Sequence, residues 1–438
     1  MVYLKLRLSR IHKISLTFVL VAFLNNLNAT DLKVYPNALA PDFASIQDAV
    51  DAALDGDNIY IDTATFVGNV SIDSKAISLY PMRDEGMYTI NGSLTISIEN
   101  NETVYIQGLS GGSCSVNYTG SGGTSISLEY TRKIIFNGCY FSSNVTVSNY
   151  VMSEIYYSEI NNDITMYDCE LIGNSFYSNV TIYSGSYAGE TKIYANKFER
   201  PICGNLLSIS TRRNTHIANN YFNSEPVCSS SPSILNCSCQ NYEIELLVEN
   251  NIFNRGGGNN YTSSSSASNP AFTFQEGIVT IRNNYMKFLQ STYSSYEFNY
   301  AQGIYCNSVA VYSFNNNIIS LYDYSESTIS TLESGSYMGS GTIQTIENNY
   351  YQLPTISTNP ATLGYITNVS NLGSTEADCR DIDNTVNDIG TYGGPHSWEN
   401  YHSSSVSKAQ ILDLEIPYYQ VILPGVELQF NAKAIHKN

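Results

Sequence analysis

The sequence predicts an all-β solenoid with about three short strands in each coil, and three observations support this prediction. A pair of polar turn residues, usually Asn-Asn, recurs between apolar residues at a regular spacing. The segments between these turns are rich in Ile, Val, Tyr, Thr and Asn, and they alternate apolar and polar residues with period two. The turn occurs in "IANNYF" (217–222), "VENNIF" (248–253), "IRNNYM" (281–286), "FNNNII" (314–319) and "IENNYY" (346–351).

The spacing of the turn extends toward the N-terminus when each stretch is aligned on its second turn residue. Successive differences of 31, 27, 24, 31, 33, 33 and 32 residues separate Gly138, Cys169, Asn196, Asn220, Asn251, Asn284, Asn317 and Asn349. A period in this range indicates an array of one supersecondary unit. The segments lack both the 3.6-residue stripes of helical repeats and the Leu framework of leucine-rich repeats, so a β-solenoid is the class that remains.

Residues 1–29 have the features of a signal peptide. A basic region ends at Lys13, an apolar run of 11 residues follows at 14–24, and small Ala29 closes the segment. The apolar run is shorter than the roughly 20 residues that a membrane helix requires. The sequence therefore predicts an exported protein, secreted or displayed at the cell surface, with no transmembrane segment after the signal is removed.

The β-helix is expected to span residues 30–401 and to begin with a capping helix at about 42–56. The apolar face of this short helix can plug the open end of the solenoid and cover its unpaired strand edge. That face consists of Ile46, Ala49, Val50 and Ala53.

The recurring Asn is predicted to be structural rather than part of a ligand site. A two-residue turn between strands requires positive φ, which Asn tolerates and which Gly138 tolerates because it lacks a Cβ. Coils stack about 4.8 Å apart, so amides at equivalent positions can form a hydrogen-bonded ladder. The predicted ladder residues are Asn196, Asn220, Asn251, Asn284, Asn317 and Asn349.

If the Asn turn joins the second and third strands of each coil, the first strand of the next coil is predicted one short loop after the third strand. These strands are expected at 144–148, 179–184, 206–211, 234–239, 271–275 and 303–307. By alternation, the inward residues are Val145, Val147, Val180, Ile182, Leu207, Ile209, Leu235, Cys237, Phe272, Phe274, Ile304 and Cys306. The outward residues are Thr146, Ser148, Thr181, Tyr183, Ser208, Ser210, Asn236, Ser238, Thr273, Gln275, Tyr305 and Asn307.

The outward residues of these strands contain no Asp, Glu, Lys, Arg or His. Glycoside hydrolysis requires a pair of carboxyl groups, and β-elimination on uronates requires a base such as Lys or Arg and usually calcium held by carboxylates. Neither set can be assembled from this face, and no histidine, His216 included, has an evident nucleophile or base as its partner. We therefore assign no residue a catalytic role, and we predict no metal site and no cofactor, with calcium implied only if the protein is a lyase.

Two C-terminal segments depart from the repeat. The stretch 381–401, "DIDNTVNDIGTYGGPHSWENY", is expected to close the solenoid. Residues 402–438 contain alternating strands around a Pro-Gly turn at 424–425 and predict a small β-module packed on the last coil.

Both ends of the repeat region resemble a known class of proteins. "DFASIQDAVDAALDGDNIYIDTATFVGNVSI" (42–72) and the stretch 381–401 are similar to the start and the closing segment of secreted bacterial right-handed parallel β-helix proteins of the pectin-lyase-like class. The resemblance implies that fold for most of the chain. It does not imply one activity, because the class includes lyases, hydrolases, epimerases and adhesins. The Asn-Thr-Asp, Asp-Asp and Gly-His-Gly strings of polygalacturonase-like members and the Arg-x-Pro-x-x-Arg string of pectate lyases are absent.

Charge and cysteine content narrow the range of partners. The formal net charge is −18 and charged residues make up 14% of the chain, so no basic patch exists to bind nucleic acid or an anionic membrane. The nine cysteines are expected to be buried thiols with one or two disulfides. "NCSCQ", with Cys237 and Cys239, lacks the converging ligands of a zinc site.

Two functions from different classes are compatible with these features. The first is an exported β-helix without catalytic activity that acts in adhesion or binds an extracellular polysaccharide. Tyr183 and Tyr305 would then stack on sugar rings, and Arg212 and Arg213 would contact an acidic group. The second is a polysaccharide lyase or glycoside hydrolase that uses loop residues outside the repeat.

Overall fold

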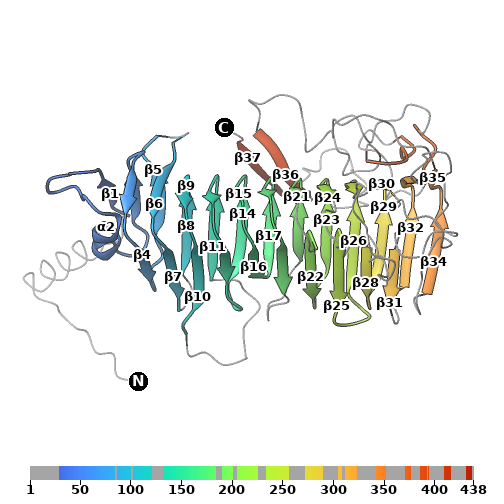
Figure 1. Ribbon diagram of the computed structural model, residues 1–438, viewed down its shortest axis with the longest axis horizontal. Helices are drawn as coiled ribbons and strands as arrows, with labels where there is room; N and C mark the ends of the chain where they lie inside the picture. The colour runs from blue at the N-terminus through green and yellow to red at the C-terminus, as the bar shows by residue number, and fades with distance from the viewer. Residues whose placement is uncertain are drawn as a thin grey trace, which may run out of the picture.

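The computed structural model is an elongated solenoid of parallel strands (Figure 1). It describes residues 29–83, 86–99, 102–120, 132–183, 190–200, 205–224, 233–255, 272–289, 304–307, 311–322, 342–351, 370–375, 385–391, 393, 409–415 and 431–436. Three long, all-parallel sheets wind along its axis, which confirms the predicted right-handed parallel β-helix.

The three sheets run the length of the solenoid. The thirteen-stranded sheet contains β1 (Asp31–Val34), β2 (Asn58–Ile61), β5 (Ser78–Pro81), β8 (Thr103–Gln107), β11 (Lys133–Asn137), β14 (Met152–Tyr156), β17 (Cys169–Ile172), β20 (Thr191–Tyr194), β23 (Thr215–Ala218), β26 (Glu245–Glu249), β29 (Ile278–Arg282), β32 (Val311–Asn315) and β34 (Thr342–Glu347). The twelve-stranded sheet contains β3 (Thr65–Val67), β6 (Tyr88–Asn91), β9 (Leu109–Gly111), β12 (Tyr140–Phe141), β15 (Glu159–Ile160), β18 (Ser175–Phe176), β21 (Lys197–Arg200), β24 (Tyr221–Ser224), β27 (Ile252–Arg255), β30 (Tyr285–Leu289), β33 (Ile318–Tyr322) and β35 (Tyr350–Tyr351). The ten-stranded sheet contains β4 (Val70–Asp73), β7 (Leu94–Ile98), β10 (Cys114–Tyr118), β13 (Val145–Val147), β16 (Ile164–Tyr167), β19 (Val180–Tyr183), β22 (Leu207–Thr211), β25 (Leu235–Cys239), β28 (Phe272–Gln275) and β31 (Ile304–Asn307).

Each coil passes through the sheets in a fixed order. The chain leaves the thirteen-stranded sheet through the Asn turn, enters the twelve-stranded sheet, crosses to the ten-stranded sheet and returns one coil further along. The strands of the ten-stranded sheet include all six that the sequence predicted as first strands. Pairing between neighbouring coils keeps equivalent residues in register, so one side-chain type can repeat along the axis.

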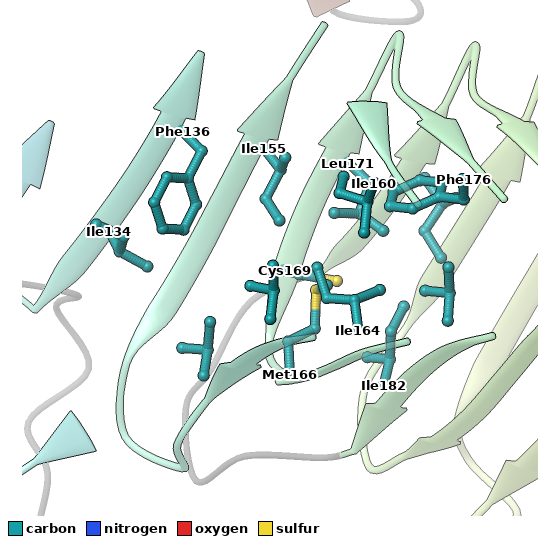
Figure 2. Close-up of a cluster of buried hydrophobic side chains, with 14 of the residues drawn as sticks. Ile134, Phe136, Ile155, Ile160, Ile164, Met166, Cys169, Leu171, Phe176 and Ile182 are labelled. Carbon is teal, nitrogen blue, oxygen red and sulfur yellow. The ribbon is translucent and has the colours of Figure 1, made fainter. Parts of the chain in front are cut away.

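The interior is apolar because alternate residues of all three sheets point inward. Figure 2 shows side chains from successive coils, among them Phe136, Ile155, Leu171 and Ile182, directed into the space between the sheets. On the twelve-stranded sheet four phenylalanines stack coil upon coil with ring centroids 4.6–5.1 Å apart, at Phe176, Phe198, Phe222 and Phe253. This continuous core supplies the main driving force for folding, since aromatic rings bury large apolar areas.

The two residues of each Asn turn have different roles: the first reverses the chain and the second forms the ladder. The sequence predicted both roles for the second residue. The first residue of each turn adopts the left-handed conformation, with φ of 59°, 55°, 57°, 57° and 55° at Asn219, Asn250, Asn283, Asn316 and Asn348. Gly138, with φ of 61°, belongs to this first position. The expectation of positive φ at the ladder residues is therefore wrong, because the tight reversal is made one residue earlier.

The second residue of each turn forms the ladder. Each side-chain oxygen from Asn196 to Asn349 accepts hydrogen bonds from both the backbone N–H and the side-chain amide of the preceding rung, at 2.9–3.0 Å. The ladder also continues toward the N-terminus through Asn174 and Ser158, whose Oγ accepts from the backbone N–H of Cys139 at 3.0 Å. From Ser158 to Asn317 these polar side chains are buried and hydrogen-bonded, so the ladder fixes the corner of the solenoid.

The alignment on Cys169 is wrong. Cys169 opens β17 at another corner, and the Asn-type turn that follows β17 is Gly173-Asn174. A further coil lies before it, with its turn at Tyr157-Ser158. Sequence spacing concealed this coil, because consecutive rungs here are only 19, 16 and 22 residues apart and Ser replaces Asn in one of them.

Helix α2 (Ile46–Ala52) caps the N-terminal end. Its buried residues are Ile46, Ala49 and Val50, and Ser45 is its N-cap. The side chain of Gln47 makes the hydrogen bonds that the backbone of a further strand would make. Its Nε2 donates to the carbonyl of Ser71 at 3.1 Å, and its Oε1 accepts from the N–H of Ser71 at 2.7 Å. Ser71 lies in β4, the edge strand of the ten-stranded sheet, so the helix covers the edge that would otherwise remain unpaired.

The described part of the closing segment, residues 385–391 and 393, lies along the Asn corner. Asn387 donates from Nδ2 to Oδ1 of Asn283 at 3.1 Å, and Asn250 donates to the carbonyl of Thr391 at 3.0 Å. Ile389 packs against a row of buried residues from β24, β27, β30 and β33. The side chains of Asn250 and Asn283, the first residues of two of these turns, thus also bind this returning segment. Beyond the closing segment, β36 (Ala409–Glu415) pairs antiparallel with β37 (Asn431–His436).

Candidate functional site

The outer face of the ten-stranded sheet carries a column of small polar side chains in register. We call it the hydroxyl column; its described members are Ser71, Thr95, Ser115, Thr146, Thr165, Thr181, Ser208, Asn236 and Thr273. All are exposed or half-buried. Strand propensity alone would also allow Val, Ile or Phe at these positions. Each member of the column instead presents a hydroxyl or an amide to solvent.

A second column lies two residues further along each strand, roughly 7 Å from the first. We call it the mixed column; it consists of Asp73, Ser97, Asn117, Tyr167, Tyr183, Ser210, Ser238 and Gln275. Asp73 is the one carboxylate among these described residues, and the column has no Lys, Arg or His. The two columns form a nearly uncharged strip that follows the solenoid axis.

Two tyrosines interrupt this strip at its centre. Tyr167 and Tyr183 are in register on β16 and β19, with ring centroids 5.4 Å apart and an angle of 36° between the ring planes. Tyr183 is 43% exposed, and the residue in register with it on the next coil is Ser210. Because serine is small, the ring face of Tyr183 on that side has no in-register neighbour of comparable size among the described residues and can receive a planar group.

Arg212 and Gln240 lie at the ends of the strands beyond this open ring face. Nε of Arg212 donates to Oε1 of Gln240 at 2.6 Å, and Nε2 of Gln240 donates to Oγ of Ser210 at 2.9 Å. The exposed guanidinium is thus oriented by a side-chain amide beside the tyrosine pair. Tyr183, Ser210, Gln240 and Arg212 form one continuous polar and aromatic surface across three coils.

Of the two other residues expected at this site, Arg213 has a different position and the side chain of Tyr305 is not described. Arg213 does not form an exposed positive edge; it is 7% exposed, and its Nε lies 3.2 Å from Oδ1 of Asp168, which is 2% exposed. The guanidinium turns inward because a buried carboxylate requires a charged partner. Tyr305 lies on β31 in register with Thr273, and its side chain is outside the described residues.

The outer face of the thirteen-stranded sheet holds titratable groups that the sequence analysis did not bring together. Nδ1 of His216 lies 2.7 Å from the Tyr194 hydroxyl, and Nε2 lies 2.7 Å from Oε1 of Glu249. The other oxygen of Glu249 accepts from Nε of Arg282 at 2.8 Å. The expectation that His216 lacks a base as partner is therefore wrong, since register places these residues on neighbouring coils although they are far apart in sequence.

A second network occupies the same face nearer the N-terminus. The Tyr156 hydroxyl lies 2.8 Å from Oε2 of Glu154 and 3.1 Å from Oε1 of Glu170, and Glu154 also pairs with Lys133. Desolvation, and then the two carboxylates, raise the pKa of Tyr156 well above its usual value, so the phenol remains a donor. Tyr156 is 4% exposed and Glu154 7% exposed, which makes this network a structural one.

The described cysteines are buried thiols. Cys114, Cys139, Cys169, Cys237 and Cys239 are all free and buried, and Cys203, Cys228, Cys306 and Cys379 lie outside the residues whose side chains are described. Among described residues no group of three His, Cys, Asp or Glu side chains could hold a metal ion. In the same part of the chain, no helix has the length and apolar character needed to cross a bilayer.

The sequence matches no protein-family model and no curated protein.

Proposed function

We propose that this protein is exported, has no catalytic activity on carbohydrates, and binds an extended extracellular polysaccharide along the outer face of the ten-stranded sheet, as an adhesion or surface protein would. The hydroxyl column is the observation that carries this proposal. Nine consecutive coils present Ser, Thr or Asn at one position, in register, on a face free of Lys, Arg and His among the described residues of its two columns. A polymer of hydroxyl-bearing rings can make equivalent hydrogen bonds to each coil.

The tyrosine pair gives this face its apolar contact. A sugar ring has a hydrophobic face that packs on aromatic rings, while its hydroxyls bond to polar groups at its edge. The open ring face of Tyr183 lies beside Ser210, Gln240 and Arg212, which supply one hydroxyl, one amide and one guanidinium. We place the strongest sugar contact there.

A neutral polysaccharide fits this face better than a polyuronate. Arg213 forms an ion pair with Asp168, so the guanidinium at this site that can contact a ligand is that of Arg212. The chain as a whole carries a formal charge of −18, which repels polyanions at low ionic strength. An acidic group on the ligand would have to be isolated and to lie beside Arg212.

Binding is tested with the secreted full-length protein on neutral and acidic polysaccharides. Tyr183→Ala combined with Tyr167→Ala is expected to raise Kd roughly tenfold, about 1.4 kcal/mol, with an unchanged unfolding midpoint. Tyr60→Ala is the matched control, because Tyr60 stacks on Tyr80 at 5.6 Å on the outer face of the thirteen-stranded sheet. Equal loss of affinity in both variants, or no loss in either, would place the ligand elsewhere.

Turnover is measured in the same samples. We expect neither new reducing ends nor the ultraviolet absorbance of unsaturated sugars, with or without calcium. Product formation would contradict the binding proposal and support the alternative, a polysaccharide lyase or glycoside hydrolase.

A further inference from the structure

The carboxylate of Asp57 is buried at the N-terminal end of the solenoid, where helix α2 and β1 lie (Figure 1). Asp57 stands between helix α2 and β2 and is 5% exposed. Its Oδ1 accepts from the backbone N–H of Thr30 at 2.7 Å, and its Oδ2 accepts from the backbone N–H of Leu54 at 2.8 Å. The side chain therefore joins the residue before β1 to the end of the capping helix.

Asp57 differs in its partners from three other buried carboxylates. Glu154, Asp168 and Glu249 each pair with a Lys, Arg or His side chain. Among the described residues, no such side chain forms an ion pair with Asp57. A buried carboxylate without a cationic partner is costly, because nothing offsets the loss of its hydration by Coulomb attraction. A positive charge beside one of its two oxygens would stabilise it.

The backbone nitrogen of Thr30 becomes such a charge when the chain is cut before it. Thr30 follows the predicted signal peptide, residues 1–29, whose last residue is the small Ala29. Hydrolysis of the Ala29–Thr30 peptide bond adds the hydroxyl of water to the carbonyl carbon of Ala29 and its proton to the nitrogen of Thr30. Near neutral pH the products are the carboxylate of Ala29 and the ammonium of Thr30, since the ordinary pKa of an α-amino group is about 8.

The surroundings of Thr30 suit both the cleavage and the ion pair. Ala29 and Thr30 are exposed, so the fold does not protect the bond between them. The carbonyl of Thr30 accepts from the N–H of Asn58 at 3.0 Å, and β1 pairs with β2 from Asp31 onward. These bonds hold Thr30 from its C-terminal side, so its nitrogen keeps its position when Ala29 is removed. The 2.7 Å between this nitrogen and Oδ1 of Asp57 is typical of an ammonium bonded to a carboxylate.

We propose that signal peptidase cleaves the chain between Ala29 and Thr30 and that the new α-ammonium of Thr30 forms an ion pair with buried Asp57. This inference rests on the export that is part of the proposed function. The ion pair fastens β1, the edge strand of the thirteen-stranded sheet, to the capping helix. The N-terminal cap thus reaches its full stability only in the processed protein.

The processing site is tested on protein recovered from the medium of cells that express the full chain, by intact mass measurement and N-terminal sequencing. The expected first residue is Thr30. Secreted protein that begins at another residue would overturn this inference and leave export standing. Absence of secreted protein, with residues 1–29 retained inside the cells, would contradict export itself and this inference with it.

A double-mutant cycle tests the ion pair. One change retains Asn28 and Ala29 before Thr30, which makes the nitrogen of Thr30 a neutral amide. The other is Asp57→Asn, which preserves the size of the side chain and removes its charge. Hydrogen exchange is followed by mass spectrometry on peptides that cover residues 30–61. Retention of the two residues is expected to speed this exchange at least tenfold in the parent and less than twofold in the Asp57→Asn protein, where no charge remains to pair.

Asp55→Asn is the matched control for this cycle. Asp55 precedes Asp57 by two residues, and its Oδ1 accepts from the N–H of Ala76 at 2.9 Å. In this variant, retention of the two residues should speed exchange as much as in the parent. An equal effect in the parent and in Asp57→Asn, or no effect in either, would overturn the ion pair.

A chemical modification tests the ion pair without any substitution. Selective acetylation of the Thr30 amine removes its charge and adds no residue, so it should speed exchange at residues 30–61 as much as retention of Asn28 and Ala29 does. Exchange at the parental rate in the acetylated protein would overturn the ion pair even if Asp57→Asn fails to fold.

Discussion

Replacing Asn284 by Leu tests how much the ladder stabilises the solenoid. The side chain is fully buried and makes five hydrogen bonds. Its Oδ1 accepts from the backbone N–H and the Nδ2 of Asn251, and its Nδ2 donates to the carbonyls of Val248 and Arg282 and to Oδ1 of Asn317. Leucine is of similar size but replaces none of these bonds.

The largest cost comes from the backbone N–H of Asn251, which would remain buried without an acceptor. Such a group costs roughly 1–3 kcal/mol, and the loss of the other bonds adds about 0.5–1.5 kcal/mol for each one that water cannot replace. We therefore expect a total loss of about 3–5 kcal/mol in the free energy of unfolding, measured by urea denaturation.

The chain itself provides the matched control, because Ser158 occupies the same ladder position. Its Oγ accepts from a backbone N–H at 3.0 Å and donates to the carbonyl of Tyr156 at 2.9 Å. Asn284→Ser retains an acceptor for the N–H of Asn251 and should lose only about half as much stability as the leucine variant. If the leucine variant unfolds at the same urea concentration as the parent, or if both variants lose equal stability, the reasoning about the orphaned N–H is refuted.

Three further predictions concern buried charge, a helix cap and a thiol. Arg213→Met should cost about 3–5 kcal/mol in urea denaturation because it leaves the Asp168 carboxylate buried and unpaired, whereas exposed Arg212→Met should change stability by less than about 0.5 kcal/mol; equal effects would contradict the buried pair. Lys75 donates from Nζ to three carbonyls at the end of helix α2, at 2.7–3.0 Å, so Lys75→Met should lower the free energy of unfolding by about 1–2 kcal/mol. Burial raises the pKa of the Cys139 thiol to about 12, so the native protein should resist thiol reagents at pH 8 and react when unfolded in urea. Because the unfolded thiol ionises near pH 8.5, the contribution of Cys139 to stability should be complete below that pH and decline as pH rises toward 12, which a series of denaturation curves from pH 8 to 11 would show.

Local features of the sequence were sufficient to predict the architecture. The Asn turns, the period-two alternation and the apolar stripe of the capping helix are signals that one segment carries without reference to its neighbours. The five Asn-Asn turns, which lie about 32 residues apart, were therefore enough to predict the positions of the later coils. The earlier coils were counted incorrectly, because Tyr157-Ser158 and Gly173-Asn174 satisfy the same geometry with other residues and shorter spacing.

The sequence by itself also determined which side chains of the ten-stranded sheet face outward, and hence the composition of the candidate binding face. It could not determine which of two adjacent arginines is exposed, because Arg213 turns inward to reach Asp168, which lies 45 positions earlier in the sequence and two coils away. The networks around His216 and Glu154 were likewise decided by tertiary structure alone. The physical reason is that a β-helix brings together residues one coil apart, and the number of residues in a coil varies with its loops, so contacts between coils depend on register rather than on spacing in the sequence.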